Sequence, residues 1–286
     1  MLSILISLAF IMDTDKEIDN AISRLVPKAY EAASAEESGR IREQVAQLLR
    51  ANKRCIPSFC KRYVVGFRDE YELGTALSIL CLMDITHAAI VQACETVLRS
   101  DRVTFHYKYD ACFLIAKNAV IMKPAAIKAL YNGLPDKLAV SLSCKLVTHI
   151  NRLPRADRLE VLRIALDISK KIPADGLGLL GAITGSMEGG TGLYAPEKYE
   201  ELYLEGLKKF TEPHHKTLLM IGLLEKDPKK YKEFEARIRK IASGDKVSRW
   251  YYEKNEEVKN WYEANKDLFE KKERGKGHQE ENDMRP

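Results

Sequence analysis

Apolar residues recur three, four and seven positions apart throughout this 286-residue chain, in short segments that end at proline, glycine, aspartate or serine. This spacing places the apolar side chains on one face of an α-helix, whereas a half-buried β-strand would alternate with a period of two. No segment alternates convincingly, so the sequence predicts an all-α fold. The predicted helices cover residues 14–31, 36–52, 54–65, 69–82, 84–99, 105–121, 123–132, 136–151, 156–171, 176–187, 196–210, 213–225, 228–242 and 246–272.

These helices recur in pairs. Amphipathic segments begin near residues 86, 123, 156, 195 and 227, at spacings of 32 to 39 residues, and each precedes a more apolar segment. One helix pair cannot bury both of its apolar stripes, whereas stacked pairs share a continuous core. The period therefore predicts an α-solenoid of about five to six two-helix repeats.

Residues 36–243 resemble the HEAT and armadillo-like helical-repeat superfamily in period, in helix pairing and at recurring sites such as Ala88-Ala89-Ile90 and Ala125-Ala126-Ile127. The resemblance implies a binding scaffold, since most such families bind other macromolecules. It also implies a second hypothesis, because a smaller group acts on nucleic acid and includes HEAT-like DNA glycosylases. Those enzymes use aromatic and acidic groups on a concave basic face.

The ends of the chain differ from the repeats. We expect a helical-repeat domain over residues 13–243, a C-terminal aromatic capping helix over 244–272, and a charged disordered tail over 273–286. Residues 1–12 form an apolar run without the cationic start and the cleavage site of a signal peptide. Three interpretations of this run remain open: an extra helix, a targeting or membrane-contact segment, and a misassigned start.

The charge balance and the cysteine content indicate the environment in which the protein works. The 46 lysines and arginines nearly balance 41 aspartates and glutamates, which gives a net charge of +5 and leaves room for a basic patch on one face. Most of the six cysteines lie in apolar helical segments, where a free thiol behaves as a small hydrophobic group. We therefore expect a cytoplasmic protein. No apolar run is long enough to span a bilayer, so we expect no integral membrane association.

The stretch 176–192, GLGLLGAITGSMEGGTG, fits the dinucleotide-binding pattern G-x-G-x-x-G at Gly176, Gly178 and Gly181. That pattern binds a pyrophosphate only between a strand and a helix, and an amphipathic helix precedes it here. Close helix packing is the favoured interpretation of these glycines, and a hinge or closing loop is the alternative.

No catalytic or metal-binding constellation is apparent. Cys55 and Cys60 are too far apart for a zinc pair and lack a second pair, and the adjacent His214 and His215 face different directions on a helix. We therefore expect no cofactor and no metal ion, and we favour a binding protein over an enzyme.

A polar row is the strongest candidate for a binding surface. Aligning residues 114–122 with 142–150 makes Lys117 and Lys145 equivalent on successive second helices of the pairs. His106 and Tyr107 are candidates to join the row, and a solvated polar face without function is the alternative. The candidate residues are Lys117, Asn118, Lys145, His149, Arg152, Arg155 and Arg158.

The sequence thus favours a scaffold or adaptor that recognises another protein through a polar and basic groove. The second hypothesis is a HEAT-like protein that binds nucleic acid, with a glycosylase-like activity as its enzymatic form.

Overall fold

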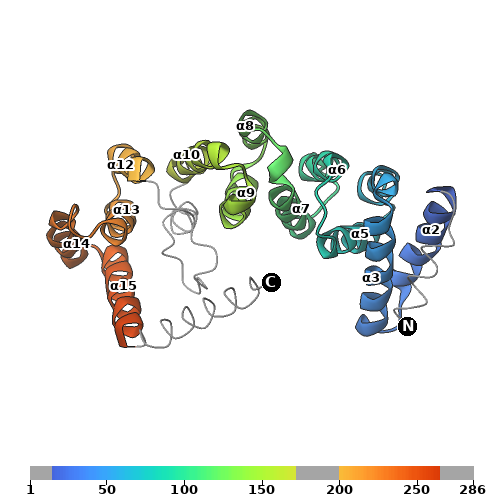
Figure 1. The fold of residues 1–286 in the computed structure, drawn as a ribbon, viewed down its shortest axis with the longest axis horizontal. Helices are drawn as coiled ribbons and strands as arrows, with labels where there is room; N and C mark the ends of the chain where they lie inside the picture. Colours follow the sequence, from blue (N-terminus) through green and yellow to red (C-terminus); the bar gives the residue numbers. More distant parts are fainter. Residues whose placement is uncertain (1–14, 172–199, 265–286) are drawn as a thin grey trace, which may run out of the picture. The chain divides into compact units, whose positions relative to one another are not determined.

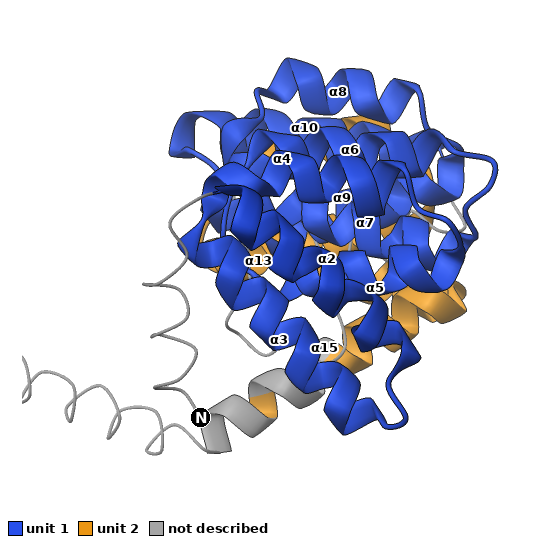
Figure 2. Ribbon diagram, turned by 90° about the vertical axis from the view of Figure 1, so that its right-hand side faces the viewer, with its two compact units in different colours: residues 1–183, 191–196 blue, residues 184–190, 197–286 orange. Residues whose placement is uncertain are grey.

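A computed structural model of the protein describes residues 15–171 and 200–264 (Figure 1). Within these residues the chain forms 13 α-helices, a few short 3-10 and π-helical turns and no strand, so the predicted all-α fold is confirmed. The residues from 15 to 171 belong to one compact unit and those from 200 to 264 to another (Figure 2). The bounds of the repeat domain stay a prediction. The terminal segments, the glycine-rich stretch and its helix at 176–187 lie outside the described residues.

Unit 1 consists of short helices joined by tight connectors. Most begin and end within a few residues of the predicted positions. They are α2 (Asp15–Glu31), α3 (Ala35–Ala51), η1 (Lys53–Cys55), α4 (Ile56–Phe59), η2 (Cys60–Val65), α5 (Glu70–Leu82), α6 (Ala88–Arg99), α7 (Phe105–Lys117), η3 (Ala119–Ile121), α8 (Pro124–Asn132), α9 (Asp136–Thr148), η4 (Ile150–Arg152) and α10 (Arg155–Lys171).

The helices of unit 1 lie in two rows (Figure 1). In one row α3 contacts α5, α5 contacts α7, and α7 contacts α9. The other row contains α6, α8 and α10, and α6 packs on both η2 and α7. Aliphatic side chains such as Leu77, Leu114 and Leu142 are fully buried between the rows. Helices α3, α5, α7 and α9 therefore bury apolar side chains against their neighbours in the row, and α7 also packs on α6 of the other row.

Polar side chains fix several helix starts. Ser34 accepts a hydrogen bond from the backbone N–H of Glu37 at 3.1 Å, and Asp69 accepts one from Glu72 N–H at 2.9 Å. His87 does the same through Nδ1 for the N–H of Ala89. These bonds satisfy N–H groups that lack a partner inside the helix. The hydrogen bond that His87 accepts also explains why α6 starts at Ala88 rather than at residue 84.

The ends of α7 and α9 have one geometry. Asn118 (φ −97°, ψ 4°) follows α7 and His149 (φ −108°, ψ 12°) follows α9, and each leads into a short 3-10 turn. Asn118 is therefore equivalent to His149, which makes Lys117 equivalent to Thr148. The sequence alignment that paired Lys117 with Lys145 is therefore shifted by three residues. It matched the two lysines rather than the ends of the two helices.

Unit 2 is built around α13. Its helices are α12 (Glu200–Lys209), α13 (Pro213–Lys226), α14 (Glu233–Gly244) and α15 (Lys246–Ala264). α13 contacts the other three and is buried along most of its length. Gly222 allows a close approach, since a Cβ there would lie 2.9 Å from the ring of the buried Tyr203. α15, which packs on α13 and α14, occupies the described part of the predicted capping helix.

All six cysteines are free thiols. Cys55, Cys60, Cys94 and Cys112 are buried, and burial raises the pKa of the Cys60 and Cys112 thiols to about 12. These thiols act as small apolar side chains of the core. Within the described residues, no helix combines the length and the apolar character needed to cross a membrane.

Candidate functional site

The structure holds the ammonium group of Lys117 against the neighbouring helix. Nζ donates to Met83 O at 2.6 Å and to Cys81 O at 3.0 Å, and the side chain is only 12% exposed. The last carbonyls of a helix lack partners within it and carry partial negative charge, which a cation neutralises. Burial lowers the pKa of Lys117, and the nearby Asp84 carboxylate opposes this shift. The Lys117 ammonium group therefore supplies hydrogen-bond donors to carbonyl groups at the end of α5.

Two arginines make similar bonds at the same helix ends. Arg152 donates to Lys117 O at 3.5 Å and pairs with Asp84 Oδ1 at 3.2 Å. From the α3 side, Arg50 donates to Leu82 O at 2.7 Å. Cations from three different helix ends thus bond to the carbonyl groups that close α5 and α7.

Asn118 is buried and joins two helices. Its Oδ1 accepts a hydrogen bond from His87 N–H at 2.8 Å, and its Nδ2 donates to Leu114 O at 2.8 Å. The side chain is 1% exposed, so it cannot contact a ligand. Asn118 fixes the start of α6 against the end of α7.

Lys145 and His149 lie on α9 and at its end. The Lys145 ammonium lies 4.4 Å from the centre of the Tyr109 ring. His149 Nδ1 is 2.9 Å from Lys145 O, and the His149 ring contacts Phe113 edge-on. Burial lowers the pKa of His149, with the nearby cations adding to the shift. Unlike the ammonium group of Lys117, that of Lys145 bonds to no backbone carbonyl of the described residues.

Arg155 and Arg158 belong to the start of α10. Arg158 donates to Leu153 O and Asn151 O, both at 3.0 Å, and so closes its own connector. Arg155 is exposed. The seven predicted residues therefore occupy neighbouring helix ends, but several of them are engaged with the backbone. Their role in binding stays a prediction.

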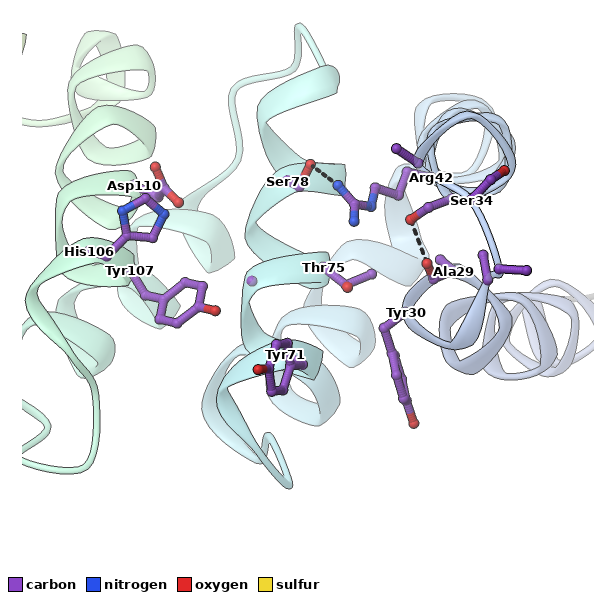
Figure 3. A pocket seen from close by; sticks show the side chains of 15 residues that line it. Ala29, Tyr30, Ser34, Arg42, Tyr71, Thr75, Ser78, His106, Tyr107 and Asp110 are labelled. Atoms are coloured by element: carbon purple, nitrogen blue, oxygen red, sulfur yellow. Dashed lines mark hydrogen bonds between the residues drawn. The ribbon is translucent and has the colours of Figure 1, made fainter.

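A pocket of about 520 Å³ lies at α3, α5 and α7, in the row of helices that also contains α9 (Figure 3). Its floor is one face of α5, on which Tyr71, Gly74, Thr75 and Ser78 are spaced as neighbours on a helix. Three of these four side chains are small, which leaves a depression between the flanking helices. The walls come from α3 with the α2–α3 connector and from α7.

Three tyrosines, Tyr30, Tyr71 and Tyr107, line this pocket. Tyr71 is 78% exposed, an unusual value for a large aromatic side chain. Tyr107 lies so close to α5 that a Cβ at Gly74 would be 2.5 Å from its Cε1 atom. Tyr30 accepts a hydrogen bond from Arg68. The pocket thus offers flat apolar surface with hydroxyl groups at its edge.

Arg42 provides the cation of the pocket. Nη1 donates to Ser78 Oγ at 3.3 Å, while Nε is buried without a partner. Among the described residues, no carboxylate lies within ion-pair distance of this guanidinium. Most of its five N–H donors are therefore left for a ligand.

His106 and Asp110 provide the opposite wall. They lie one turn apart on α7 and face the pocket together (Figure 3). Within the described part of the chain, Asp110 makes no hydrogen bond or ion pair. Burial raises the pKa of its carboxyl group, and His106 and Lys145 partly offset this rise. His106, a candidate for the basic row on sequence alone, lies on this wall of the pocket.

Unit 2 holds a second unusual histidine. The His215 side chain is fully buried and stacks on Phe210 at a ring-centre distance of 4.7 Å, and neither ring nitrogen has a hydrogen bond to the described residues. Its Nδ1 lies 3.7 Å from a Glu212 carboxylate oxygen. Burial, aided by the adjacent His214, lowers the pKa of His215 to about 4. His215 is therefore a neutral core residue at pH 7.

Within residues 15–171 and 200–264, no three His, Cys, Asp or Glu side chains form a group that could hold a metal ion. The groups that line the pocket are the tyrosine rings, the Arg42 guanidinium, the His106 imidazole and the Asp110 carboxylate.

Sequence reasoning missed Arg42 and Tyr71. Arg42 looks like any charged residue on an amphipathic helix, because the lack of a partner becomes visible only when α5 is placed beside it. A usable signal was present in α5, where Gly74, Thr75 and Ser78 interrupt an otherwise apolar helix on one face. A glycine there costs about 0.5 to 1 kcal/mol, which indicates a close approach by another group.

No protein-family model matches the chain, and comparisons with curated proteins and with solved structures give no match. Function must therefore be inferred from the side chains and their geometry.

Proposed function

We propose that this protein is a helical-repeat scaffold of the HEAT-like α-solenoid type that binds a segment of another protein in the α3–α5–α7 pocket. Two features support the repeat architecture. Helices α3, α5, α7 and α9 contact one another in sequence, and the connectors after α7 and α9 share one backbone geometry. Stacked helix pairs of this kind commonly present one row of helices to a partner.

The observation that carries the proposal is Tyr71. An exposed tyrosine over a depression is typical of the aromatic anchors that contribute most binding energy at protein interfaces. The pocket that Tyr71 lines, at about 520 Å³, is within the usual size range of ligand pockets and has room for a few side chains of a partner. A peptide segment supplies both apolar groups for the tyrosines and polar groups for Arg42 and Asp110.

Charge favours a peptide over nucleic acid at this site. A phosphate backbone is negative along its whole length, and it would meet the Asp110 carboxylate in the pocket. The Lys117 ammonium, which the sequence offered for phosphate contacts, is bonded to carbonyl groups of α5. The pocket is therefore poorly matched to a uniform polyanion.

The test is a selection of displayed random peptides on the full chain, followed by affinity measurements on the enriched peptides by fluorescence anisotropy. Tyr71→Ala should weaken binding by about 10- to 30-fold, as expected for an anchor worth about 1.4 to 2 kcal/mol. Tyr252→Ala, a tyrosine substitution on α15, is the matched control and should have no effect. Circular dichroism would verify that both variants are folded.

Two outcomes would contradict the proposal. One is the absence of any enriched peptide. The other is tight binding of generic DNA that falls steeply with salt and is unchanged by Tyr71→Ala, which would favour the nucleic-acid hypothesis.

A further inference from the structure

The pocket separates two opposite charges across one helix face. Figure 3 places Arg42 on the α3 side of α5, and His106 and Asp110 on the α7 side. The floor between them is the face of α5 that carries Gly74, Thr75 and Ser78. The Tyr107 ring of α7 lies against Gly74. Arg42 and Asp110 do not form an ion pair with each other.

Within the described residues, the Arg42 end lacks an anionic acceptor. A partly buried guanidinium without a carboxylate is costly, because burial removes water from its N–H groups and only one hydrogen bond to a neutral hydroxyl replaces it. Arginine forms its strongest hydrogen bonds with carboxylate or phosphate oxygens. An anionic side chain is therefore the group that best completes this end.

The Asp110 end lacks a donor. A carboxylate can accept several hydrogen bonds, and none is supplied by the described residues. The charges of His106 and Lys145 act on Asp110 from a distance, but neither side chain forms an ion pair with it. A cationic side chain of a ligand is the group that best completes this end.

We infer that the pocket recognises a peptide segment carrying two opposite charges: Arg42 receives an acidic side chain and Asp110 receives a basic side chain of the same segment. The inference rests on the proposed peptide binding and adds the chemistry of the partner. An apolar or aromatic residue between the two charged residues would pack on Tyr71 and Tyr107.

The probes are four sets of synthetic peptides built on an enriched sequence. One set carries an acidic and a basic residue, a second has the acid replaced by its amide, a third has the base replaced by norleucine, and a fourth has both changes. The mixed-charge set should bind best, and each single change should weaken binding by about 10-fold or more, as expected for a desolvated charge pair. Equal binding of all four sets would overturn the inference, and this readout requires no change in the protein.

Protein variants assign each charge to its end. Arg42→Gln should remove the effect of the acidic residue and keep that of the basic one, while Asp110→Asn should do the reverse. Arg40→Gln, an exposed position on the same helix, and Asp101→Asn, an exposed position before α7, are matched controls and should change neither effect.

The two proposals fail in different ways. If no peptide of any kind binds, the proposed function is wrong. If peptides bind and lose affinity with Tyr71→Ala, but Arg42→Gln and Asp110→Asn weaken all four sets equally, peptide binding stands and charge recognition is wrong.

Discussion

Mild acid should destabilise unit 2 through His215. The ring is fully buried, contacts the rings of Phe210 and His214, and makes no hydrogen bond to the described residues; a Glu212 carboxylate oxygen lies 3.7 Å from Nδ1. In the unfolded chain the same imidazole takes up a proton near its ordinary pKa of about 6.5, whereas in the folded protein its pKa is about 4. Between these values the unfolded state binds a proton that the folded state excludes, so stability falls as the pH falls.

The size of this effect follows from the two pKa values. By pH 5 the free energy of unfolding should be lower by about 2 kcal/mol, and the full loss below pH 4 should approach about 3 kcal/mol. The carboxyl groups of Glu212 and Asp245 have lowered pKa values, so the stability that they contribute is lost at still lower pH. Between pH 6.5 and pH 5, the loss of stability of unit 2 therefore comes mainly from His215.

Tryptophan fluorescence can follow unit 2 alone. The only two tryptophans of the chain, Trp250 and Trp261, lie on α15, which packs on the helix that contains His215. Urea unfolding at pH 7 and at pH 5 would give the stability of this unit in each condition. His215→Phe keeps a ring of similar size that cannot take a proton, so the variant should lose much less stability than the wild type between these values. An equal loss in both proteins would refute the reasoning.

Further predictions concern unit 1 and can be checked by thermal or urea unfolding. Gly74→Ala should cost about 1 to 3 kcal/mol and weaken peptide binding, because the new methyl group would displace the Tyr107 ring; Gly39→Ala, with open space around it, should be neutral or slightly stabilising. Lys117→Met should cost about 2 kcal/mol because two helix-terminal carbonyls lose a charged donor, whereas Lys145→Met should cost less than about 1 kcal/mol. Similar costs for the two lysine variants, or a neutral Gly74→Ala, would contradict these structural roles.

Sequence periodicity was enough to place most helices of the described residues. The segment predicted at 136–151 forms α9, and that predicted at 213–225 forms α13, with bounds that differ by a few residues. The differences have local causes. α7 ends at Lys117 rather than at residue 121 because Asn118 turns its side chain back onto Leu114 O and starts a 3-10 turn. The spacing of apolar residues in the sequence gives no sign of such a polar bond.

The site was less predictable because its chemistry depends on neighbours in space. The sequence marks Lys117 as a charged residue near a helix end, but only the position of α5 shows that its ammonium is already bonded. Arg42 is the opposite case, since only the fold shows that no acidic side chain of the described residues pairs with it. The charge of Lys117 and Arg42 alone could therefore not show which of the two side chains is available to a ligand.

The bonds at the helix ends also bear on how unit 1 opens. Lys117, at the end of α7, holds the carbonyl groups of α5, and Arg152, after α9, reaches the carbonyl of Lys117. Detaching α9 would therefore remove a donor from the end of α7, and detaching α7 would leave carbonyls of α5 exposed. Local opening in one helix pair raises the free energy of the pair before it, so fraying should spread from neighbour to neighbour. Amide protection against hydrogen exchange would then rise and fall together along this row, even though each helix contacts only the next.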